Sequence, residues 1–389
     1  MKCDELFKEI EALNDKYLKV WEDVCNIESP TNFKEGVDAV GQYFIQMAEE
    51  RGWRTEIFKQ PVSGNVICIT LNPKSQAKPI TFSGHVDTVH PIGLFGKPAV
   101  KMDEEKIYGP GVTDCKGGVV ASFMAMDALD RVGFRERPVQ LLLQTDEEVG
   151  SRTSNKETIG YICRKAANSI AFLNMEGYSK GKAYIQRKGI ITYKFTISGQ
   201  AAHSSMCSTR GASAIAEAAH KILELEKVKN PNGLTCNCGM IQGGTAVNTV
   251  PAQCIFFANF RYATLEELNI ARELVGKLAA ENVISGCSCE VEQTGYRTAM
   301  VYEERNIRLL QAMNDIYASN GLPVLNAMKG NGGSDAADVT EYGIPCIDSL
   351  GTEGGFLHSK DEYAWLRSLA EAAKRVAAVA YLLDINYDE

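Results

Sequence analysis

The sequence has little of what marks membrane proteins or nucleic-acid-binding proteins. No apolar run in its 389 residues approaches the ~18–20 residues that a membrane span needs. Lys and Arg total 41 against 49 Asp and Glu, so the formal net charge is −8. Because no basic stripe interrupts this acidic balance, we expect neither a nucleic-acid partner nor a membrane partner.

Cysteine is too sparse for a disulfide scaffold. The chain has 12 cysteines, about three per cent of its residues and far below the density of disulfide-rich domains. The pairs Cys236/Cys238 and Cys287/Cys289 lack the two-residue spacer of a zinc knuckle. Segment 1–24 lacks the apolar core that a signal peptide has, and its pattern is that of an amphipathic surface helix. We therefore expect reduced thiols in a cytoplasmic protein.

Signatures of nucleotide binding and of serine hydrolases are also missing. Gly109–Asp114 lacks the third glycine of a dinucleotide-binding fingerprint, and no phosphate-binding G-x-x-x-x-G-K-[ST] loop occurs. The chain contains neither a G-x-S-x-G elbow nor an HExxH motif. Nucleotide binding is therefore a weak interpretation of the glycine-rich segments.

What is present predicts an α/β chain of more than one domain. Hydrophobic residues make up 45% and charged residues 23%, as in globular proteins, and single cores stop growing near ~250–300 residues. Apolar runs of strand length occur at Pro79–His85, Pro138–Asp146, Ser169–Met175 and Pro345–Gly351. Helical patterns over Gly117–Gly133 and 365–383 accompany them. This alternation favours an α/β fold with a mostly parallel sheet flanked by helices.

The middle of the chain has a different order of elements. Strand patterns occur at Gly189–Ser198, 236–244, 253–263 and 287–296. Helical patterns occur at Arg210–Lys227, after the first strand, and at 264–282, after the third. This β-α-β-β-α-β order is typical of a ferredoxin-like sandwich. Its two ends adjoin segments of the first sheet, so we expect a domain over 187–294 that is inserted into a domain formed by 1–186 and 295–389.

Residues that can bind a metal gather at the ends of the predicted strands and in glycine-rich loops. They are His85, Asp114, Glu147, Glu148, Glu176 and His358. In open α/β sheets, sites form outside the carboxyl ends of the strands, and imidazoles with carboxylates suit zinc or a related divalent ion. Each residue alone could be an ordinary surface or core residue, and we interpret His90 and His220 in that way. Their conjunction at one sheet edge indicates a metal site.

Six ordered motifs identify a family. SGHVDTV, GPGVTDCKGG, QTDEEVGS, NMEG, SGQAAHSS and GFLHSKDEY resemble, in order and spacing, motifs of the zinc-dependent family of glutamate carboxypeptidase, aminoacylase and succinyl-diaminopimelate desuccinylase. The resemblance covers nearly the whole chain and is closest to the bacterial glutamate carboxypeptidases. It implies a catalytic domain of zinc-peptidase type with an inserted lid and dimerisation domain.

The resemblance also implies a set of metal ligands. Two zinc ions per subunit would be bridged by Asp114 and by a water or hydroxide. One ion would also bind Glu148 and His358, and the other would bind His85 and Glu176. Cobalt or manganese would suit the same ligands.

Further roles are implied for residues that do not bind the metals. Glu147 would be the general base, and Asp87 would orient the imidazole of His85. His203 matches the family histidine that reaches into the partner subunit's active site and stabilises the oxyanion, so we expect a homodimer formed through the lid. Glu176 stands where aminopeptidase relatives have Asp, which favours a substrate with a free carboxylate. Cys115 is expected near the metals.

Four residues are expected to contact the substrate. Asn248 and Arg261 match lid positions that hold a substrate carboxylate. Lys182 and Arg297 fall near positions that contact glutamate in the carboxypeptidases, although both could equally be exposed hinge cations. Together they predict a hydrolase that releases a C-terminal amino acid, glutamate in the first instance, from a small peptide or N-acyl substrate.

Other functions remain open at this point. Within the same family, an N-acyl-amino-acid deacylase, a desuccinylase and a dipeptidase all use the same metal chemistry. From other classes, the chain could be a catalytically inactive binding module or a protein with a structural zinc. Structural zinc sites favour closed, cysteine-rich tetrahedra, which these ligands do not resemble.

Overall fold

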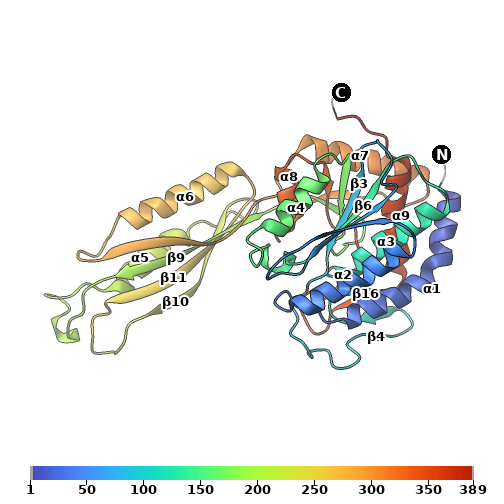
Figure 1. Ribbon diagram of the computed structural model, residues 1–389. Coiled ribbons are helices and arrows are strands. Elements are labelled where there is room, and N and C mark those ends of the chain that lie inside the picture. Colours follow the sequence, from blue (N-terminus) through green and yellow to red (C-terminus); the bar gives the residue numbers. More distant parts are fainter. Residues whose placement is uncertain (1–2, 388–389) are drawn as a thin grey trace. The chain divides into compact units, whose positions relative to one another are not determined.

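The computed structural model describes residues 3–387 and divides into two compact units. The first unit runs up to Ile185 and also includes Tyr302–Lys329 and the chain from Ser334 onward. The second unit consists of Gln186–Val301 and Gly330–Gly333. Both units are layers of helices packed on a sheet (Figure 1).

The central sheet of the first unit carries the candidate site. Its six strands have the order β1-β2-β6-β3-β7-β14. In that order they span Arg54–Phe58, Val66–Leu71, Val139–Gln144, Ile80–His85, Ala171–Asn174 and Cys346–Ile347. β3 pairs in parallel with β6 and β7, and β14 pairs in parallel with β7, whereas the β1–β2 and β2–β6 pairings are antiparallel. The carboxyl ends of β3, β6 and β7 therefore meet at one edge.

Helices cover both faces of this sheet (Figure 1). The helices of the unit are α1 (Asp4–Asn26), α2 (Lys34–Glu49), α3 (Lys116–Arg131), α4 (Glu157–Ala166), α7 (Glu304–Ser319), α8 (Ala336–Glu341) and α9 (Arg367–Leu382). α1 buries Leu6, Ile10, Leu13 and Tyr17, a spacing of three and four residues that places one apolar face on the core. α3 is buried along nearly its whole length and packs against α1 and α9.

A second, smaller sheet in this unit was not anticipated from the sequence. Its strands have the order β15-β16-β5-β4 and span Gly354–Gly355, Tyr363–Trp365, Lys106–Tyr108 and Lys101–Met102. Strands of two or three residues are too short to show the period-two alternation that predicts a strand. A two-stranded ribbon of β8 (Lys182–Arg187) and β13 (Asn326–Gly330) carries the chain from one unit to the other.

The second unit has the expected ferredoxin-like order. Its elements are β9 (Gly189–Ser198), α5 (Ala214–Leu225), β10 (Thr235–Gly243), β11 (Gln253–Tyr262), α6 (Leu265–Ala280) and β12 (Ser288–Arg297). The sheet order is β10-β11-β9-β12 with antiparallel pairing throughout. Residues of β9 and β11 alternate between buried and half-buried, because one sheet face packs on the two helices. Thr264 caps α6 by accepting a hydrogen bond from the Glu267 N–H (3.2 Å).

These observations confirm the predicted fold class, an α/β domain with a mostly parallel sheet and an inserted α+β domain. The second unit extends past residue 294 to Val301, because Ala299 belongs to its apolar core. All twelve cysteines are free thiols. Among the helices of residues 3–387, none combines the length and the hydropathy of a membrane span.

Candidate metal centre and active site

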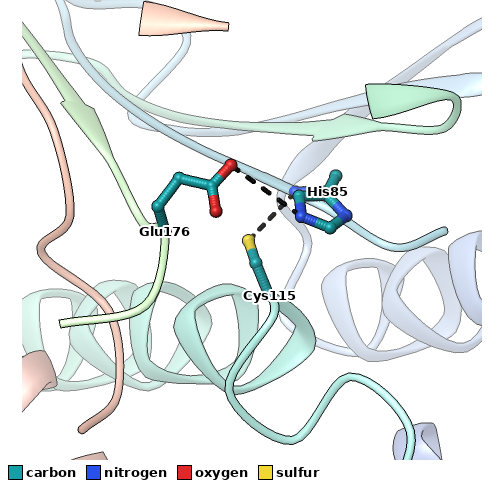
Figure 2. Close-up of side chains that lie close together, drawn as sticks. All are labelled: His85, Cys115 and Glu176. Carbon is teal, nitrogen blue, oxygen red and sulfur yellow. Dashed lines mark hydrogen bonds and ion pairs between the residues drawn. The ribbon is translucent and has the colours of Figure 1, made fainter. Parts of the chain in front are cut away.

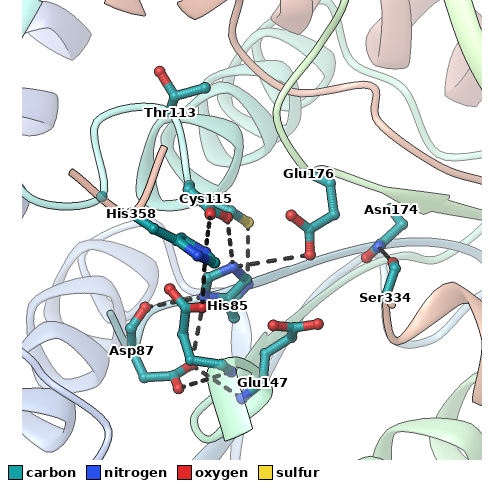
Figure 3. A network of polar contacts seen from close by, with 12 residues as sticks. His85, Asp87, Thr113, Cys115, Glu147, Asn174, Glu176, Ser334 and His358 are labelled. Atoms are coloured by element: carbon teal, nitrogen blue, oxygen red, sulfur yellow. Dashed lines mark hydrogen bonds and ion pairs between the residues drawn. The ribbon is translucent and has the colours of Figure 1, made fainter. Parts of the chain in front are cut away.

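The edge where β3, β6 and β7 end brings the expected metal ligands together (Figure 3). His85 is the last residue of β3, and Glu148 lies in the 3₁₀ helix η1 (Glu147–Val149) that follows β6. Glu176 follows β7 by two residues, and Asp114 lies in the loop before α3. The fifth residue, His358, lies in the turn between β15 and β16.

Asp114 lies between two imidazoles. Its Oδ1 is 3.1 Å from His85 Nε2, and its Oδ2 is 3.0 Å from His358 Nε2. His358 Nε2 is also 3.2 Å from Glu148 Oε2, and His85 Nε2 is 3.8 Å from Glu176 Oε1. One carboxylate thus faces two clusters, each containing one imidazole and one further carboxylate. A bridging ligand between two cations needs this arrangement.

The electrostatics of the cluster fit a site for divalent cations. Burial raises the pKa of Glu148 to about 7 and raises that of Glu176 well above its usual range. Hydrogen bonds to Asp114 and Glu148 raise the pKa of His358 to about 10. Despite burial, hydrogen bonds with His358 and His85 lower the pKa of Asp114. The raised pKa values of Glu148, Glu176 and both imidazoles mean that these four groups hold protons when no other positive charge is present. Divalent cations would replace those protons, and the oxygen and nitrogen donors suit zinc.

Asp87 lies behind the cluster and connects its parts. Its fully buried carboxylate accepts N–H hydrogen bonds from Glu147 (3.2 Å) and Glu148 (3.3 Å) and a hydroxyl hydrogen bond from Thr31 (2.7 Å). His85 Nδ1 lies 3.0 Å from the main-chain oxygen of Asp87 and 3.4 Å from carboxylate Oδ1. Of the two contacts between Asp87 and His85, the one made by the main-chain oxygen of Asp87 is the shorter. The carboxylate of Asp87 mainly positions η1.

Glu147 lies beside the ligand cluster without belonging to it. It begins η1, is 7% exposed, and lies close enough to Glu176 for electrostatic repulsion to contribute to the raised pKa of Glu176. The groups of side chains with metal-binding geometry in residues 3–387 contain Glu148 and Glu176, but neither Glu147 nor His358. His358 contacts Asp114 and Glu148 directly, whereas no such contact with these two residues is described for Glu147. A carboxylate beside a metal site that is not itself a ligand is suited to proton transfer.

Cys115 packs directly against one half of the cluster (Figure 2). Its Sγ accepts a hydrogen bond from the backbone N–H of His85 (3.2 Å), and the thiol is fully buried. A ligand atom from each of His85, Cys115 and Glu176 lies within 4.8 Å of the others. The thiol therefore helps to fix the end of β3 at which His85 lies.

Glu362 is a further residue at the site that the sequence did not single out. This fully buried carboxylate accepts N–H hydrogen bonds from Gly111 (3.2 Å), Thr113 (2.9 Å) and Asp114 (3.0 Å). It also lies 2.9 Å from Nε2 of His90, which is not among the described metal-binding groups. Glu362 follows His358 by four residues, so one side chain fixes the loop that carries Asp114 to the segment that carries His358. The only sequence signal was its place in the GFLHSKDEY motif.

The second unit places His203 and Asn248 side by side. The Ser204 N–H donates to the main-chain oxygen of Asn248 (2.9 Å), and both His203 and Asn248 are exposed. His203 Nδ1 accepts the N–H of Ser205 (3.3 Å) and lies 2.8 Å from its hydroxyl. Because Nδ1 is an acceptor, the ring proton is on Nε2, which is left able to donate.

Two expected substrate contacts lie next to each other in the second unit. Arg261 on β11 and Arg297 on β12 both pair with Ile190 of the intervening strand β9, so their side chains share one face of the sheet. Burial and the charge of Arg297 lower the pKa of Arg261. Lys182 belongs to the first unit, where it is exposed at the start of β8. The structure thus places the two arginines on one sheet face of the second unit, whereas Lys182 belongs to the first unit.

Comparisons with known proteins match this architecture. The model of the peptidase family M20/M25/M40 matches residues 81–382. Carboxypeptidase G2 of Pseudomonas sp. (strain RS-16) is 28% identical over 357 residues, which cover 89% of this chain and 84% of that protein. Succinyl-diaminopimelate desuccinylase of Rickettsia rickettsii (strain Sheila Smith) is 28% identical over 200 residues, which cover 48% of this chain and 51% of that protein. The crystal structure of aminopeptidase PepT from Bacillus cereus ATCC 10987 shares the fold, with a TM-score of 0.78, 20% identity, and coverage of 95% and 98% of the two chains.

Proposed function

The chain belongs to the peptidase family M20/M25/M40, and on that premise we propose that it is a two-zinc amide hydrolase that releases C-terminal glutamate from an N-acyl or peptidyl substrate. The observation that carries the proposal is the position of Asp114. Each of its carboxylate oxygens faces one imidazole, at 3.1 Å and 3.0 Å. This is the arrangement that a carboxylate needs to hold two cations side by side.

The donors divide into two sets that share Asp114. Glu148 and His358 would complete one cation site, and His85 and Glu176 would complete the other. The three carboxylates carry −3 against +4 for two zinc ions, which leaves a positive site for an attacking oxygen. Bound zinc would polarise the substrate carbonyl and lower the pKa of a water molecule.

Glu147 is the residue proposed to move the proton. Its carboxylate would take a proton from the attacking water and later deliver it to the departing amine, so that one group serves as base and then as acid. The hydrogen bond from its backbone N–H to the buried Asp87 holds η1 in place. A proton carrier needs such a fixed position because transfer requires hydrogen-bond distance.

His203 is proposed to donate its Nε2 proton to the developing oxyanion in the active site of a partner subunit. An exposed imidazole whose Nδ1 is already an acceptor supports this role. The proposed homodimer would form through the second unit. Support comes from β10, an edge strand on which Met240 is 67% exposed and Ile241 is 56% exposed.

The glutamate assignment depends on the paired arginines. Two guanidinium groups on one sheet face suit a leaving amino acid with two carboxylates, and Arg binds carboxylates through paired N–H donors. We propose that Arg261, Arg297 and Asn248 hold these carboxylates, and that Lys182, an exposed residue at the start of β8, contributes less. A neutral N-acyl-amino acid would offer these arginines one carboxylate, whereas diaminopimelate, like glutamate, would offer two, so the desuccinylase is the alternative that the substrate panel must separate from the glutamate-releasing enzyme.

A substrate panel tests the assignment. Purified protein would be incubated, with zinc and with a chelator, with N-acyl-glutamates, neutral N-acyl-amino acids, N-succinyl-diaminopimelate and dipeptides, and the released amino acid would be read by mass spectrometry. We expect chelator-sensitive release of glutamate in preference to every other amino acid. Preference for a neutral amino acid would overturn the glutamate assignment. Absence of chelator-sensitive turnover from the whole panel would overturn the hydrolase.

A further inference from the structure

The first unit contains a buried cation that the proposed chemistry does not use. Arg375 belongs to α9 (Figure 1), and only 5% of its surface is exposed. Within residues 3–387, no ion pair joins its guanidinium to a carboxylate. A buried charge without an opposite charge lowers stability unless other polar groups compensate it. The groups that compensate this charge therefore show what the side chain holds in place.

Two main-chain oxygens and one aromatic ring compensate the charge of Arg375. Its Nη2 donates to the main-chain oxygens of Leu350 (3.2 Å) and Gly351 (2.8 Å). Its Cζ lies 3.9 Å from the ring centroid of Tyr178, well within the reach of a cation–π contact. Leu350 and Gly351 follow β14, and Tyr178 follows β7. One side chain of α9 thus joins the two segments that leave these paired strands.

The segment after β14 holds the main chain at Glu176. The Gly351 N–H donates to the main-chain oxygen of Glu176 (3.0 Å), and the Leu350 N–H donates to that of Asn174 (3.1 Å). The two segments lie so close that a Cβ on Gly351 would be 2.2 Å from the main-chain oxygen of Met175. These hydrogen bonds continue the parallel pairing of β14 with β7 as far as a proposed metal ligand.

Thr352 connects the same segment to the loop that carries Asp114. Its hydroxyl donates to the main-chain oxygen of Val112 (3.2 Å), and Val112 precedes Asp114 by two residues. Thr352 is fully buried, which strengthens a hydrogen bond of this kind. The segment that Arg375 fixes therefore contacts two of the chain segments that carry proposed ligands.

We propose that Arg375 is a positioning residue for Glu176, and that it sets the affinity of the cation site that Glu176 shares with His85. The contacts of its guanidinium are with Leu350, Gly351 and Tyr178, so it would act through the main chain on either side of the ligand. The inference depends on the proposed two-zinc hydrolase for the identity of the metals. It adds a determinant of one cation site on a helix that carries no proposed ligand.

The other cation site should be affected less. Its ligand Glu148 lies in η1, which the carboxylate of Asp87 holds through the N–H groups of Glu147 and Glu148. Its ligand His358 is separated from Gly351 by β15, which has its own pairing with β16. Arg375 therefore has a shorter path to Glu176 than to either of these two ligands.

Zinc content measured by plasma mass spectrometry, after dialysis against a chelator at fixed free zinc, tests the inference. Arg375→Met removes the donors and the charge but keeps a long apolar side chain. We expect the affinity of one site to fall by about 10–100-fold, as when other groups that orient metal ligands are lost. At free zinc between the two affinities, the content should fall from about two ions per subunit to about one.

The matched control is Arg367→Met, the same substitution at an exposed position of the same helix, which should keep the wild-type zinc content. If the wild type binds two zinc ions and Arg375→Met has the same affinities, only this inference is overturned. If the wild type binds no zinc, both this inference and the proposed hydrolase are overturned.

Combined variants show whether the effect passes through Glu176. In a Glu176→Gln background, Arg375→Met should change the affinity of the remaining site by less than about 2-fold, because the ligand that it positions is already lost. In a Glu148→Gln background, Arg375→Met should keep its full effect of about 10–100-fold. Equal effects in the two backgrounds would contradict the positioning role, since a general loss of stability weakens both sites alike.

Activity at saturating zinc separates positioning from catalysis. We expect kcat of Arg375→Met to return to about the wild-type value when free zinc exceeds the weakened Kd by about 100-fold. If Arg375→Met does not fold, Arg375→Lys serves in its place, because it keeps the charge but replaces the planar donor group. It should weaken the same site by a smaller factor. A kcat that stays low although both sites are filled would overturn the proposed role.

Discussion

At the scale of single residues, Glu147 and Glu148 are neighbours in the same 3₁₀ helix but have different surroundings. Glu148 Oε2 contacts the imidazole of His358 at 3.2 Å, whereas Glu147 lies outside the metal-binding groups of the described residues. Adjacent carboxylates can therefore have different roles, one as a metal ligand and one as a proton carrier. The two roles predict different phenotypes.

Glu147→Ala should abolish turnover without releasing metal. Loss of the general base should lower kcat by about 10²–10⁴-fold, while all five proposed ligands remain in place. The measurement combines kcat with metal content from plasma mass spectrometry. Glu136→Ala, an exposed substitution in the same unit, is the control. Retained activity in the Glu147 variant would contradict the assignment.

Glu362→Gln should weaken metal binding although Glu362 is not a ligand. The amide NH₂ would face N–H donors that now point at a carboxylate oxygen, so the loop that carries Asp114 would lose its position. Residues that hold metal ligands in position through hydrogen bonds typically increase the affinity for the metal by about 10–100-fold. Competition with a chelator measures this change. His90→Asn, which keeps the Glu362 carboxylate, should have a smaller effect, and equal zinc affinities for wild type and Glu362→Gln would contradict the positioning role.

Zinc binding should release protons at neutral pH. The pKa of His358 is raised to about 10 and that of Glu148 to about 7, so in the metal-free protein the imidazole is charged at pH 7 and Glu148 is half protonated. Ligands must lose these protons to bind a cation, and affinity should therefore rise with pH. Calorimetry in two buffers of different ionisation enthalpy should report the release of more than one proton per subunit. Zinc binding whose enthalpy is the same in both buffers would contradict this expectation.

At the scale of elements, a buried polar contact joins three helices away from the site. Asp127 on α3 accepts hydrogen bonds from Tyr17 on α1 (2.7 Å) and from Arg51, which follows α2 (2.8 Å). Despite the opposing effect of burial, these contacts lower the pKa of Asp127 to about 2. A carboxylate of this kind stabilises the packed helices only while it is ionised.

Asp127→Asn should lower the free energy of unfolding by about 3 kcal/mol at pH 7, because Arg51 would be left partly buried without its partner. The folded pKa lies below the unfolded value of about 3.9. The contribution of Asp127 is thus full above pH 4 and falls as the pH drops from there toward 2. Urea unfolding at pH 7 and pH 3 should show a smaller difference between variant and wild type at the lower pH. Asp15→Asn, exposed on α1, is the control, and a difference that does not shrink would contradict the linkage.

Long, periodic elements were predictable from the sequence, and short ones were not. The alternation of β9 and β11 and the capping box of α6 are local signals, and all three elements lie where they were expected. The small sheet has strands of two or three residues that are defined by partners far away in the sequence, such as Tyr363 opposite Tyr108. No local pattern encodes such a pairing, so the small sheet could be found only in three dimensions.

The candidate site was likewise predictable from the sequence only in part. Strand ends and motif order predicted which residues would gather around Asp114, because the ends of neighbouring parallel strands meet at one edge. The contact between His90 and Glu362 joins residues 272 positions apart and had no such signal. The shared face of Arg261 and Arg297 depends on the register of both strands against Ile190, which composition does not specify.

At the scale of the whole molecule, the two units carry complementary parts of the proposed reaction. The ligands and Glu147 belong to the first unit, whereas His203 and the paired arginines belong to the second. If His203 acts on the partner subunit, neither subunit has a complete site of its own. The edge strand β10, with exposed Met240 and Ile241, offers the surface through which two second units would pair.

Mixing two inactive variants should therefore restore activity. Glu147→Ala lacks the base, and His203→Ala lacks the oxyanion donor, whose loss should lower kcat by about 10²–10³-fold. In a mixed dimer, the subunit with an intact Glu147 would receive an intact His203 from its partner, so one of the two sites would be complete. After unfolding and refolding together at equal concentration, random pairing predicts about a quarter of wild-type activity. Each variant refolded alone is the control. No recovery in a mixture that sedimentation shows to be dimeric would mean that His203 does not act across subunits, and a fully active monomer would exclude the dimer itself.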